Sequence, residues 1–426
     1  MTVTPAKPQG CPAENSDLIF DTEIFIRDQS AEDKAQYILD YLNQGGSIQP
    51  ILEKLEYELN TKHGYRRAYY GDLNGDNIPE LFLMFSGILP HTFELIGCVN
   101  GEYENLYMID LGGMVYVDIL MINDINLDGL PEVVLMMKPY LGMSYWLGYQ
   151  ILGWDGSSFQ SLVSQTEFDG LNSLGGVQWE WIRMPGLGSQ SPWDGDSWEI
   201  KDIDQNGTWE LIIRGGIETS WDFIRHGPYQ PVTQIFMWNG EGFVMDDLQV
   251  GPPEYRFQAV QNGDLYTLMH KYGRANEAYR QAIDDPNLAW WSEESEAFIN
   301  AKLDAKFGEF PTPTMSAPDK NEYPNLAAYA HYRIFLLHVL QGQLPEAEEA
   351  YQAIQAQYFA EETGYIYGQI AKIFWGEYQA SEDIHSACAE VVDYAAMHQD
   401  EVLRYIGGYH GWQSLDYDVT DICPFR

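Results

Sequence analysis

Basic residues are scarce in this chain. It carries 23 Lys and Arg against 64 Asp and Glu, which gives a formal net charge of −41. Such a surface repels nucleic-acid phosphates and anionic membrane surfaces, so both are poor partners. The sequence also lacks any apolar run near the ~20 residues that a membrane-spanning helix needs. The acidity is suited either to solubility alone or to attracting cations.

Motifs of the common enzyme classes are missing as well. The sequence contains no HExxH, GxSxG or P-loop motif, and no GxGxxG follows a predicted strand. The histidines show no metal-ligand spacing, and carboxylates are too abundant for one pair to stand out as a glycosidase pair. We therefore expect that the protein is not an enzyme.

Cysteine is limited to Cys11, Cys98, Cys388 and Cys423, without a CxxC pair, so a zinc–thiolate site is not expected. The even number permits two disulfides in an oxidising compartment, or the thiols are buried and free. A bond between Cys388 and Cys423 would tie the C-terminal tail to a helix. The N-terminus before Cys11 has no apolar core and is not a signal peptide; it resembles a tether left after a signal or lipoprotein leader is removed.

The length of 426 residues indicates two or three domains, and the pattern predicts an α+β multidomain protein. Ser30 is expected to cap one short helix and Ser47 to begin another. Dense Gly and aromatic residues then indicate strands and turns, before helical patterns return. In chain order the predicted units are a linker (1–20), an N-terminal helical segment (21–62), an antiparallel β domain (63–250) and an α-helical domain (251–426).

An acidic loop occurs three times in the predicted β domain. DLNGDNIPELFL begins at Asp72, DINLDGLPEVVL at Asp124 and DIDQNGTWELII at Asp202. Each copy is followed by an apolar strand, an Asn-Gly or Asp-Gly turn and another strand, which is a hairpin pattern. The repeated unit is thus loop, strand, strand, tight turn and strand, and its repetition indicates an array of small sheets.

The loop spacing suits a calcium ion. Side-chain oxygens at positions 1, 3 and 5 can wrap around a cation, a backbone carbonyl at position 7 can add to them, and Glu at position 9 can close the cage. Position 6 is Asn77, Gly129 or Gly207, residues that tolerate a positive φ at a sharp bend. The predicted ligands are Asp72, Asn74, Asp76, Ile78 and Glu80; Asp124, Asn126, Asp128, Leu130 and Glu132; and Asp202, Asp204, Asn206, Thr208 and Glu210.

Magnesium, an EF-hand and a plain surface turn are the alternatives to a calcium cage. Mg²⁺ is disfavoured because it demands octahedral geometry and keeps its waters. An EF-hand is excluded, because its position 12 requires Glu and the three copies have Leu83, Leu135 and Ile213 there. A solvated, Asx-rich surface turn without an ion remains open. The recurrence of the same spacing and the same downstream hairpin favours up to three Ca²⁺ ions.

The pattern D-x-[ND]-x-[DN]-G-x-x-[DE] before an apolar strand resembles the FG-GAP/VCBS repeats of integrin α-subunit propellers and many secreted bacterial proteins. The resemblance covers roughly residues 65–250 and implies calcium held in loops between blade strands, with adhesion or extracellular association as the role. Three copies are few for a closed propeller, which typically needs at least four blades. An open sheet array or an irregular small propeller is therefore expected.

The C-terminal part resembles a degenerate tetratricopeptide-like array. Gly273, Gly342 and Gly376 precede helical patterns, and the last two are 34 residues apart. The best copy spans 328–361, with Tyr332, Phe335 and Leu336 predicted on its first helix. A generic helical bundle is the alternative; a solenoid would offer a concave surface to peptides or subunits.

These observations predict a secreted or cell-surface bacterial protein that binds calcium and mediates adhesion or extracellular assembly through its helical domain. One alternative is an extracellular polysaccharide-binding module or hydrolase with structural calcium. Its aromatic residues would come from the insertion that holds Trp179, Trp181, Trp193 and Trp198, which otherwise is a hydrophobic plug. A second alternative is a cytosolic scaffold with reduced thiols.

Overall fold

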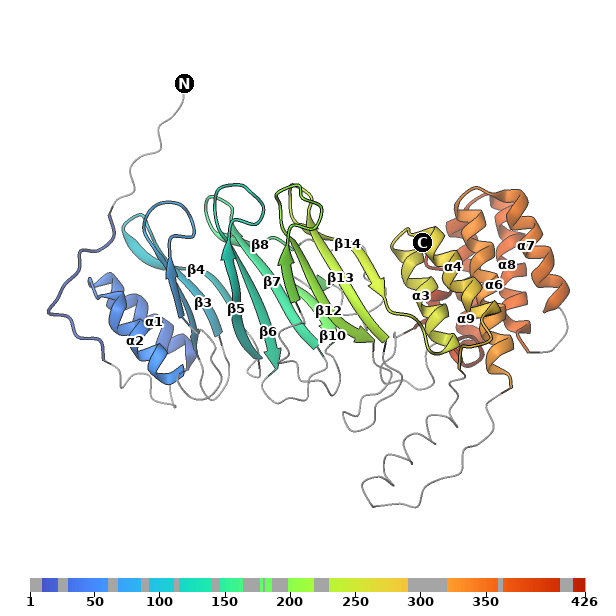
Figure 1. The fold of residues 1–426 in the computed structure, drawn as a ribbon, viewed down its shortest axis with the longest axis horizontal. Coiled ribbons are helices and arrows are strands. Elements are labelled where there is room, and N and C mark those ends of the chain that lie inside the picture. The colour runs from blue at the N-terminus through green and yellow to red at the C-terminus, as the bar shows by residue number, and fades with distance from the viewer. Residues whose placement is uncertain are drawn as a thin grey trace, which may run out of the picture.

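A computed structural model represents the chain (Figure 1). The described residues are 10–21, 30–59, 68–85, 92–110, 115–139, 146–163, 177–178, 181–185, 198–217, 230–289, 320–358, 363–406 and 417–425. They form an N-terminal helical pair, a central row of antiparallel sheets and a C-terminal group of helices. This arrangement confirms the mixed α and β architecture and the order of its parts.

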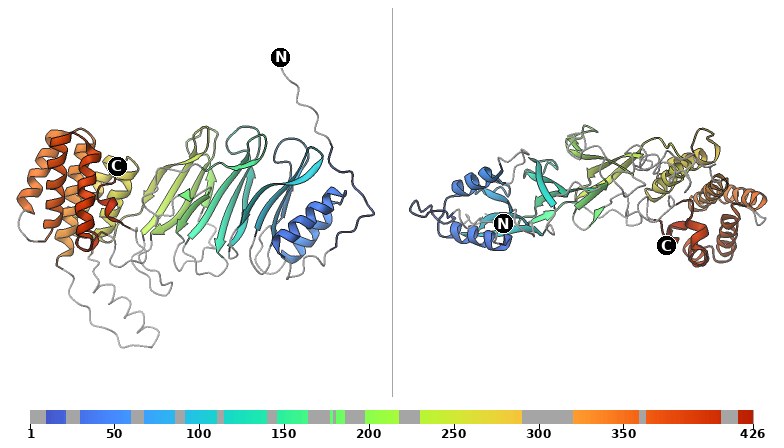
Figure 2. Two further views of the ribbon diagram at one scale, coloured as in Figure 1. Left: turned by 180° about the vertical axis from the view of Figure 1, so that it is seen from behind. Right: turned by 90° about the horizontal axis from the view of Figure 1, so that it is seen from below.

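Two short helices open the fold. Helix α1 (Ala31–Asn43) is capped by Ser30, whose side chain accepts the N–H of Asp33 at 3.0 Å, as the sequence predicts. Helix α2 (Ile48–Leu59) follows directly after Ser47. Both helices bury their apolar face against the first sheet, where Leu81, Leu83 and Ile96 are fully buried. The helical pair therefore covers the outer face of this sheet (Figures 1 and 2).

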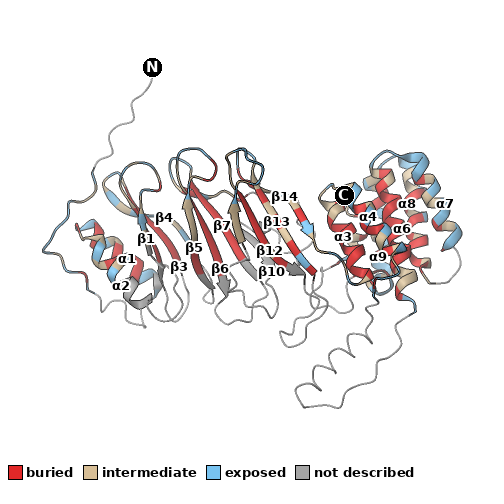
Figure 3. Cartoon of the chain, viewed as in Figure 1, coloured by how far each residue is buried: buried red, intermediate tan, exposed pale blue. Residues whose placement is uncertain are grey.

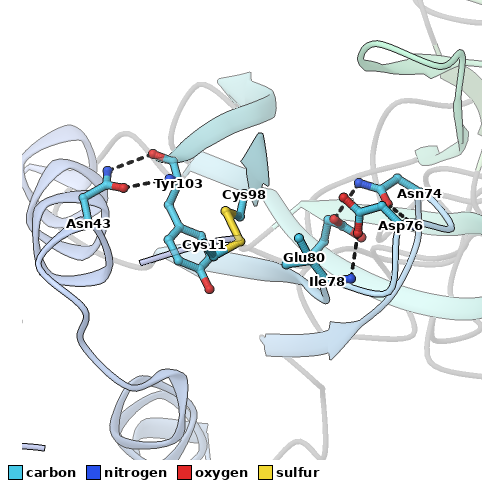
Figure 4. Close-up of a disulfide and its surroundings, with 8 residues drawn as sticks. All are labelled: Cys11, Asn43, Asn74, Asp76, Ile78, Glu80, Cys98 and Tyr103. Carbon is cyan, nitrogen blue, oxygen red and sulfur yellow. Dashed lines mark hydrogen bonds between the residues drawn. A yellow bond between two sulfur atoms is a disulfide. The ribbon is translucent and has the colours of Figure 1, made fainter. Parts of the chain in front are cut away.

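The segment before α1 is attached to this sheet as well. A disulfide joins Cys11 to Cys98 of strand β3, and the N–H of Asn15 donates to the carbonyl of Gly45 at 2.7 Å. At the other end of α1, the Asn43 amide exchanges two hydrogen bonds with the backbone of Tyr103, at 2.7 and 2.9 Å (Figure 4). From Cys11 onward, the described part of the predicted linker is thus docked on the fold.

The described strands form three antiparallel sheets. The first contains β1 (Ala68–Gly71), β2 (Glu80–Phe85), β3 (Thr92–Val99) and β4 (Glu102–Asp110). The second contains β5 (Val115–Asn123), β6 (Glu132–Pro139), β7 (Trp146–Trp154), β8 (Phe159–Ser161), β9 (Val177–Gln178) and β10 (Trp181–Pro185). The third contains β11 (Trp198–Lys201), β12 (Glu210–Ile217), β13 (Gln230–Trp238) and β14 (Phe243–Val250).

The strand order reproduces the repeated unit predicted from the sequence. The first and third sheets run β1-β2-β3-β4 and β11-β12-β13-β14, and the second begins β5-β6-β7. In the second sheet β8 and β10 share one edge of β7, with β8 beside its C-terminal half and β10 beside its N-terminal half. The insertion between β8 and β11 therefore widens the middle sheet.

Apolar side chains alternate between the two faces of the middle sheet, so that each face packs against a neighbouring sheet. In β6, Val133, Leu135 and Met137 belong to the core shared with the first sheet. Val134 and Met136 point to the opposite face and join the core shared with the third sheet. Among the described residues the sheets form an open row and no closed ring (Figures 1 and 2).

The C-terminal helices follow as consecutive pairs: α3 (Arg256–Leu268) with α4 (Tyr272–Asp284), α6 (Glu322–Leu340) with α7 (Leu344–Gln357), and α8 (Tyr365–Ser381) with α9 (Ile384–Met397). A short α10 (Gln399–Leu403) and a 3₁₀ turn, η3 (Val419–Ile422), complete the described elements. Figure 3 shows α3 and α6 largely buried and α7 with a broad exposed side. No described helix is long and apolar enough to cross a membrane.

One prediction for this part is wrong. The sequence pattern places Gly376 before a helix, but this residue lies inside α8, and α9 begins at Ile384 after an Asp383 cap. Nothing lies close to Gly376, so the glycine costs only about 1 kcal/mol of helix propensity and marks no boundary. The helix starts themselves are 43 residues apart from α6 to α8 (322 to 365) and 40 apart from α7 to α9 (344 to 384). The unit is therefore longer than the 34-residue spacing that the glycines suggest.

Candidate functional site

The three acidic loops occupy the same structural place in their sheets. Each connects the first strand to the second: β1 to β2, β5 to β6, and β11 to β12. Because the strands are antiparallel, these loops lie at one edge of the row, together with the tight turns that follow β3, β7 and β13 (Figure 1). The row thus gathers its acidic loops along a single edge.

The Glu at position 9 closes each loop from the start of the second strand. Its carboxylate accepts the backbone N–H of position 2: Leu73 to Glu80 at 2.7 Å, Ile125 to Glu132 at 2.9 Å, and Ile203 to Glu210 at 2.6 Å. All three Glu residues are at most 1% exposed. A carboxylate is held inside every loop, where water cannot compensate its charge.

The side chains at positions 1, 3 and 5 turn inward by a shared set of hydrogen bonds. Position 1 accepts the N–H of position 6, from Asn77, Gly129 or Gly207, at 3.0–3.1 Å. The side-chain oxygen at position 3 accepts the backbone N–H of position 5 at 2.9–3.0 Å. The side-chain oxygen at position 5 accepts the backbone N–H of position 7 at 2.6–2.8 Å. Figure 4 shows this arrangement in the first loop, where Asn74, Asp76 and Glu80 face one another. The three loops therefore share one hydrogen-bond pattern, and among the described residues a close approach of three carboxylates is found in the third copy.

The backbone bends twice in each loop. Position 6 has a positive φ in Asn77, Gly129 and Gly207, as predicted. Position 4 also has a positive φ, at 79° for Gly75, 65° for Leu127 and 62° for Gln205. Leu and Gln rarely adopt this conformation, which costs roughly 1–3 kcal/mol where it is imposed. All three loops therefore have the same backbone conformation at position 4, even where Leu127 and Gln205 disfavour it.

Electrostatics make the loops poor places for a carboxylate without a counter-charge. Burial raises the pKa of Glu80 and of Glu132 from 4.5 to about 7, against the lowering effect of their backbone hydrogen bonds. Neighbouring carboxylates at positions 1 and 5 contribute to this rise in both pKa values. Burial also raises the pKa of Glu210. A bound cation would reverse this unfavourable balance.

The third loop carries the clearest donor set. Carboxylate oxygens of Asp202, Asp204 and Glu210 lie within 4.8 Å of one another. One oxygen of Glu210, Oε1, is buried without a hydrogen-bond partner, while Oε2 accepts the N–H of Ile203. Hard carboxylate oxygens without nitrogen or sulfur are the ligands that Ca²⁺ prefers. This geometry fits a calcium ion between the three side chains.

In the first loop an amide compensates the buried carboxylate. Asn74 donates through Nδ2 to Oε1 of Glu80 at 2.8 Å. In the second loop, Asn126 donates to Asp128 at 3.1 Å, and Oδ1 of Asp124 is buried without a partner. Rotation of either amide by half a turn would present its oxygen, which is the atom that a cation requires.

Adjacent loops touch one another. The N–H of Trp209 in the third loop donates to the carbonyl of Ile125 in the second at 2.9 Å. Leu130 of the second loop packs on Gly75 of the first so closely that a Cβ there would lie 2.7 Å from it. The close approach explains glycine at position 75, and it makes each loop a support for its neighbour.

Other residues singled out by the sequence lie elsewhere. Trp179 and Trp193 fall outside the described residues, and Trp181 begins β10. Trp198, at the start of β11, packs partly buried against the core. The histidines form no metal cluster among the residues that the structure describes.

Comparison with models of known protein families gives no match, and comparison with curated proteins gives no relative.

Proposed function

We propose that this is a calcium-binding structural protein of the cell exterior, with FG-GAP/VCBS-like repeats that hold up to three Ca²⁺ ions. The observation that carries the proposal is the third loop, where Oε1 of Glu210 is buried without a hydrogen-bond partner and one carboxylate oxygen each of Asp202, Asp204 and Glu210 lies within 4.8 Å of the others. The other two loops carry the same number of carboxylates and amides, with Asn at position 3 and Asp at position 5 in place of Asp204 and Asn206. Position 7 adds a backbone carbonyl from Ile78, Leu130 or Thr208.

The calcium ions would serve architecture. Each loop joins two strands of one sheet and rests on the loop of the next sheet, so an ion that fixes a loop also fixes the contact between sheets. An ion surrounded by four side chains and a carbonyl has little room for a substrate. A non-catalytic role in adhesion or extracellular assembly follows.

Two further features support this setting. The disulfides Cys11–Cys98 and Cys388–Cys423 are of the kind that persists in oxidising surroundings outside the cytosol. The consecutive helix pairs of the C-terminal part resemble a solenoid, whose faces bind protein partners or further subunits. Adhesion or assembly through this helical part, in a secreted or surface-attached bacterial protein, is the function that we propose.

Calcium titration tests the proposal. Metal-free full-length protein is titrated with Ca²⁺ by calorimetry, and bound ions are counted after dialysis. We expect up to three ions per chain, and about 2.7 kcal/mol of added stability per independent site at a hundredfold excess over the Kd.

Glu210→Gln should abolish one of these sites. Glu241→Gln is the matched control, because Glu241 is exposed in the turn after β13 on the same edge of the row. Protein that binds no calcium at millimolar concentration, or that binds it equally well without Glu210, would show the proposal to be wrong.

A further inference from the structure

The C-terminal end of the chain lies against the first helix of the helical part. In Figure 1 the C-terminus overlaps α3, and the view from below in Figure 2 places it beside the last helices, drawn in red. The hydroxyl of Tyr417 donates to the carboxylate of Asp264 in α3, across 153 residues of sequence. The end of the chain has therefore returned to the face formed by α3, α6 and α8, the first helices of the three pairs.

Side chains on this α3–α6–α8 face bind backbone carbonyls of the returning chain. Gln261 of α3 donates to the carbonyl of Ile406 at 2.9 Å, and Tyr367 of α8 donates to that of Val402 at 2.6 Å. Arg333 of α6 donates to two more, those of Asp421 at 2.9 Å and Ile422 at 3.3 Å. The carbonyls of Val402 and Ile406 belong to α10 and the turn after it, whereas those of Asp421 and Ile422 belong to the last described segment. Arg333 therefore holds the main chain of this segment through its side chain, as peptide-binding surfaces do.

The centre of the face is a buried charge pair. Nε of Arg333 lies 3.1 Å from Oδ1 of Asp264, and both side chains are at most 5% exposed. Tyr279 and Tyr329 donate to the same carboxylate at 2.5 and 3.0 Å. These bonds orient the guanidinium before any main chain arrives, since they come from α3, α4 and α6 alone.

The face retains hydrogen-bonding capacity beyond these contacts. Oε1 of Gln261 and Oδ1 of Asn262 are buried and have no hydrogen-bond partner in the described part of the chain. Both belong to α3, one turn or less from Asp264. They are acceptors suited to main-chain N–H groups, which complement the carbonyls that the donors already bind.

A covalent bond keeps the returning segment in place. Cys423 is disulfide-bonded to Cys388 of α9, and Ile422 and Cys423 are fully buried. The segment thus combines main-chain hydrogen bonds, one buried apolar side chain and a tyrosine hydroxyl. These are the components of a short bound peptide that has been fastened to its receptor.

We propose that the α3–α6–α8 face is a peptide-binding site, and that Tyr417–Phe425 of the same chain is its resident ligand. The external ligand that fits the site is the same segment of a second copy, which makes the same bonds to Asp264 and Arg333. A small-molecule or protein thiol that reduces the Cys388–Cys423 bond, leaving two cysteine thiols while the reductant is oxidised to its own disulfide, allows this exchange and yields a swapped dimer. The inference does not depend on calcium in the loops.

The test uses the full-length chain with Cys388→Ser and Cys423→Ser together. A fluorescent peptide of the sequence Tyr417–Phe425, with Ser in place of Cys423, is added, and binding is followed by polarisation. We expect binding to the double variant and none to the oxidised wild type, and we expect concentration-dependent dimers of the variant in ultracentrifugation. Adding Arg333→Lys should weaken binding about tenfold. Lys keeps the positive charge but lacks the planar guanidinium that donates to the carbonyls of Asp421 and Ile422.

A peptide with Tyr417→Phe is the matched control for the ligand, and we expect about tenfold weaker binding because Asp264 loses one donor. Amide hydrogen exchange on the oxidised wild type gives a second result that does not depend on the double variant folding. If Tyr417–Phe425 is a resident ligand, its backbone amide hydrogens should exchange faster than those in the core of α6. Equal protection of the two segments, or a folded double variant that binds no peptide and stays monomeric, overturns the proposal.

Discussion

The buried glutamates should make the stability of the calcium-free protein fall as pH rises. The pKa of Glu132 is 4.5 when unperturbed and about 7 in the fold, because burial favours the protonated form. A carboxyl whose folded pKa is raised stabilises the protein only while it is protonated, so stability declines between the unfolded and folded values. Integration from about pH 5.5 to pH 8 gives roughly 2 kcal/mol lost at this residue.

Urea unfolding of metal-free protein across this pH range measures the effect, and Glu132→Gln isolates it. The variant should be more stable than wild type, and this difference should grow by roughly 2 kcal/mol between about pH 5.5 and about pH 8. Saturating calcium should reverse that order at high pH, since the ion needs the carboxylate. Glu241→Gln, an exposed neighbour on the same edge, should follow wild type throughout. Parallel pH profiles for Glu132→Gln and wild type would refute the reasoning.

Two further perturbations test other parts of the fold. Arg333→Met should lower the free energy of unfolding by about 3–5 kcal/mol, because Asp264 is left as a buried, unpaired charge; urea unfolding measures this, and a loss below about 1 kcal/mol would contradict it. Replacing Cys11 and Cys98 by Ser should cost about 4–5 kcal/mol, because the bond closes a loop across 87 residues. Thermal unfolding against the wild type in the oxidised state checks this loss, and an unchanged Tm would contradict it.

Much of the β region could be predicted because its signals are local and repeated. The donor positions, the bend at position 6 and the tight turns depend on short stretches of sequence, and three copies separate the pattern from chance. The bend at position 4 could not be predicted from Leu127 and Gln205, because neither residue favours a positive φ. There the contacts of the loop override the preference of the residue.

Other features depend on proximity in space. The spacing of Cys11 and Cys98 along the chain contains no information about their closeness, which follows from the docking of the N-terminal segment. Arg333 and Asp264 are charged residues on helices and would be assigned to the surface by pattern alone, yet they pair in the core. Gly376 misleads for a related reason, since an exposed helical glycine and a glycine at a helix end look the same in sequence.

The Cys11–Cys98 bond also determines how the protein would carry a load. A pull on the segment before Cys11 passes through the sulfur atoms directly into β3 of the first sheet. The intervening stretch, with α1 and α2, is bypassed and bears no tension. Antiparallel strands resist force through many hydrogen bonds at once. The disulfide therefore transfers the force from the small helical pair to the first sheet. A protein tethered at its N-terminus would in this way keep its first helices folded under shear.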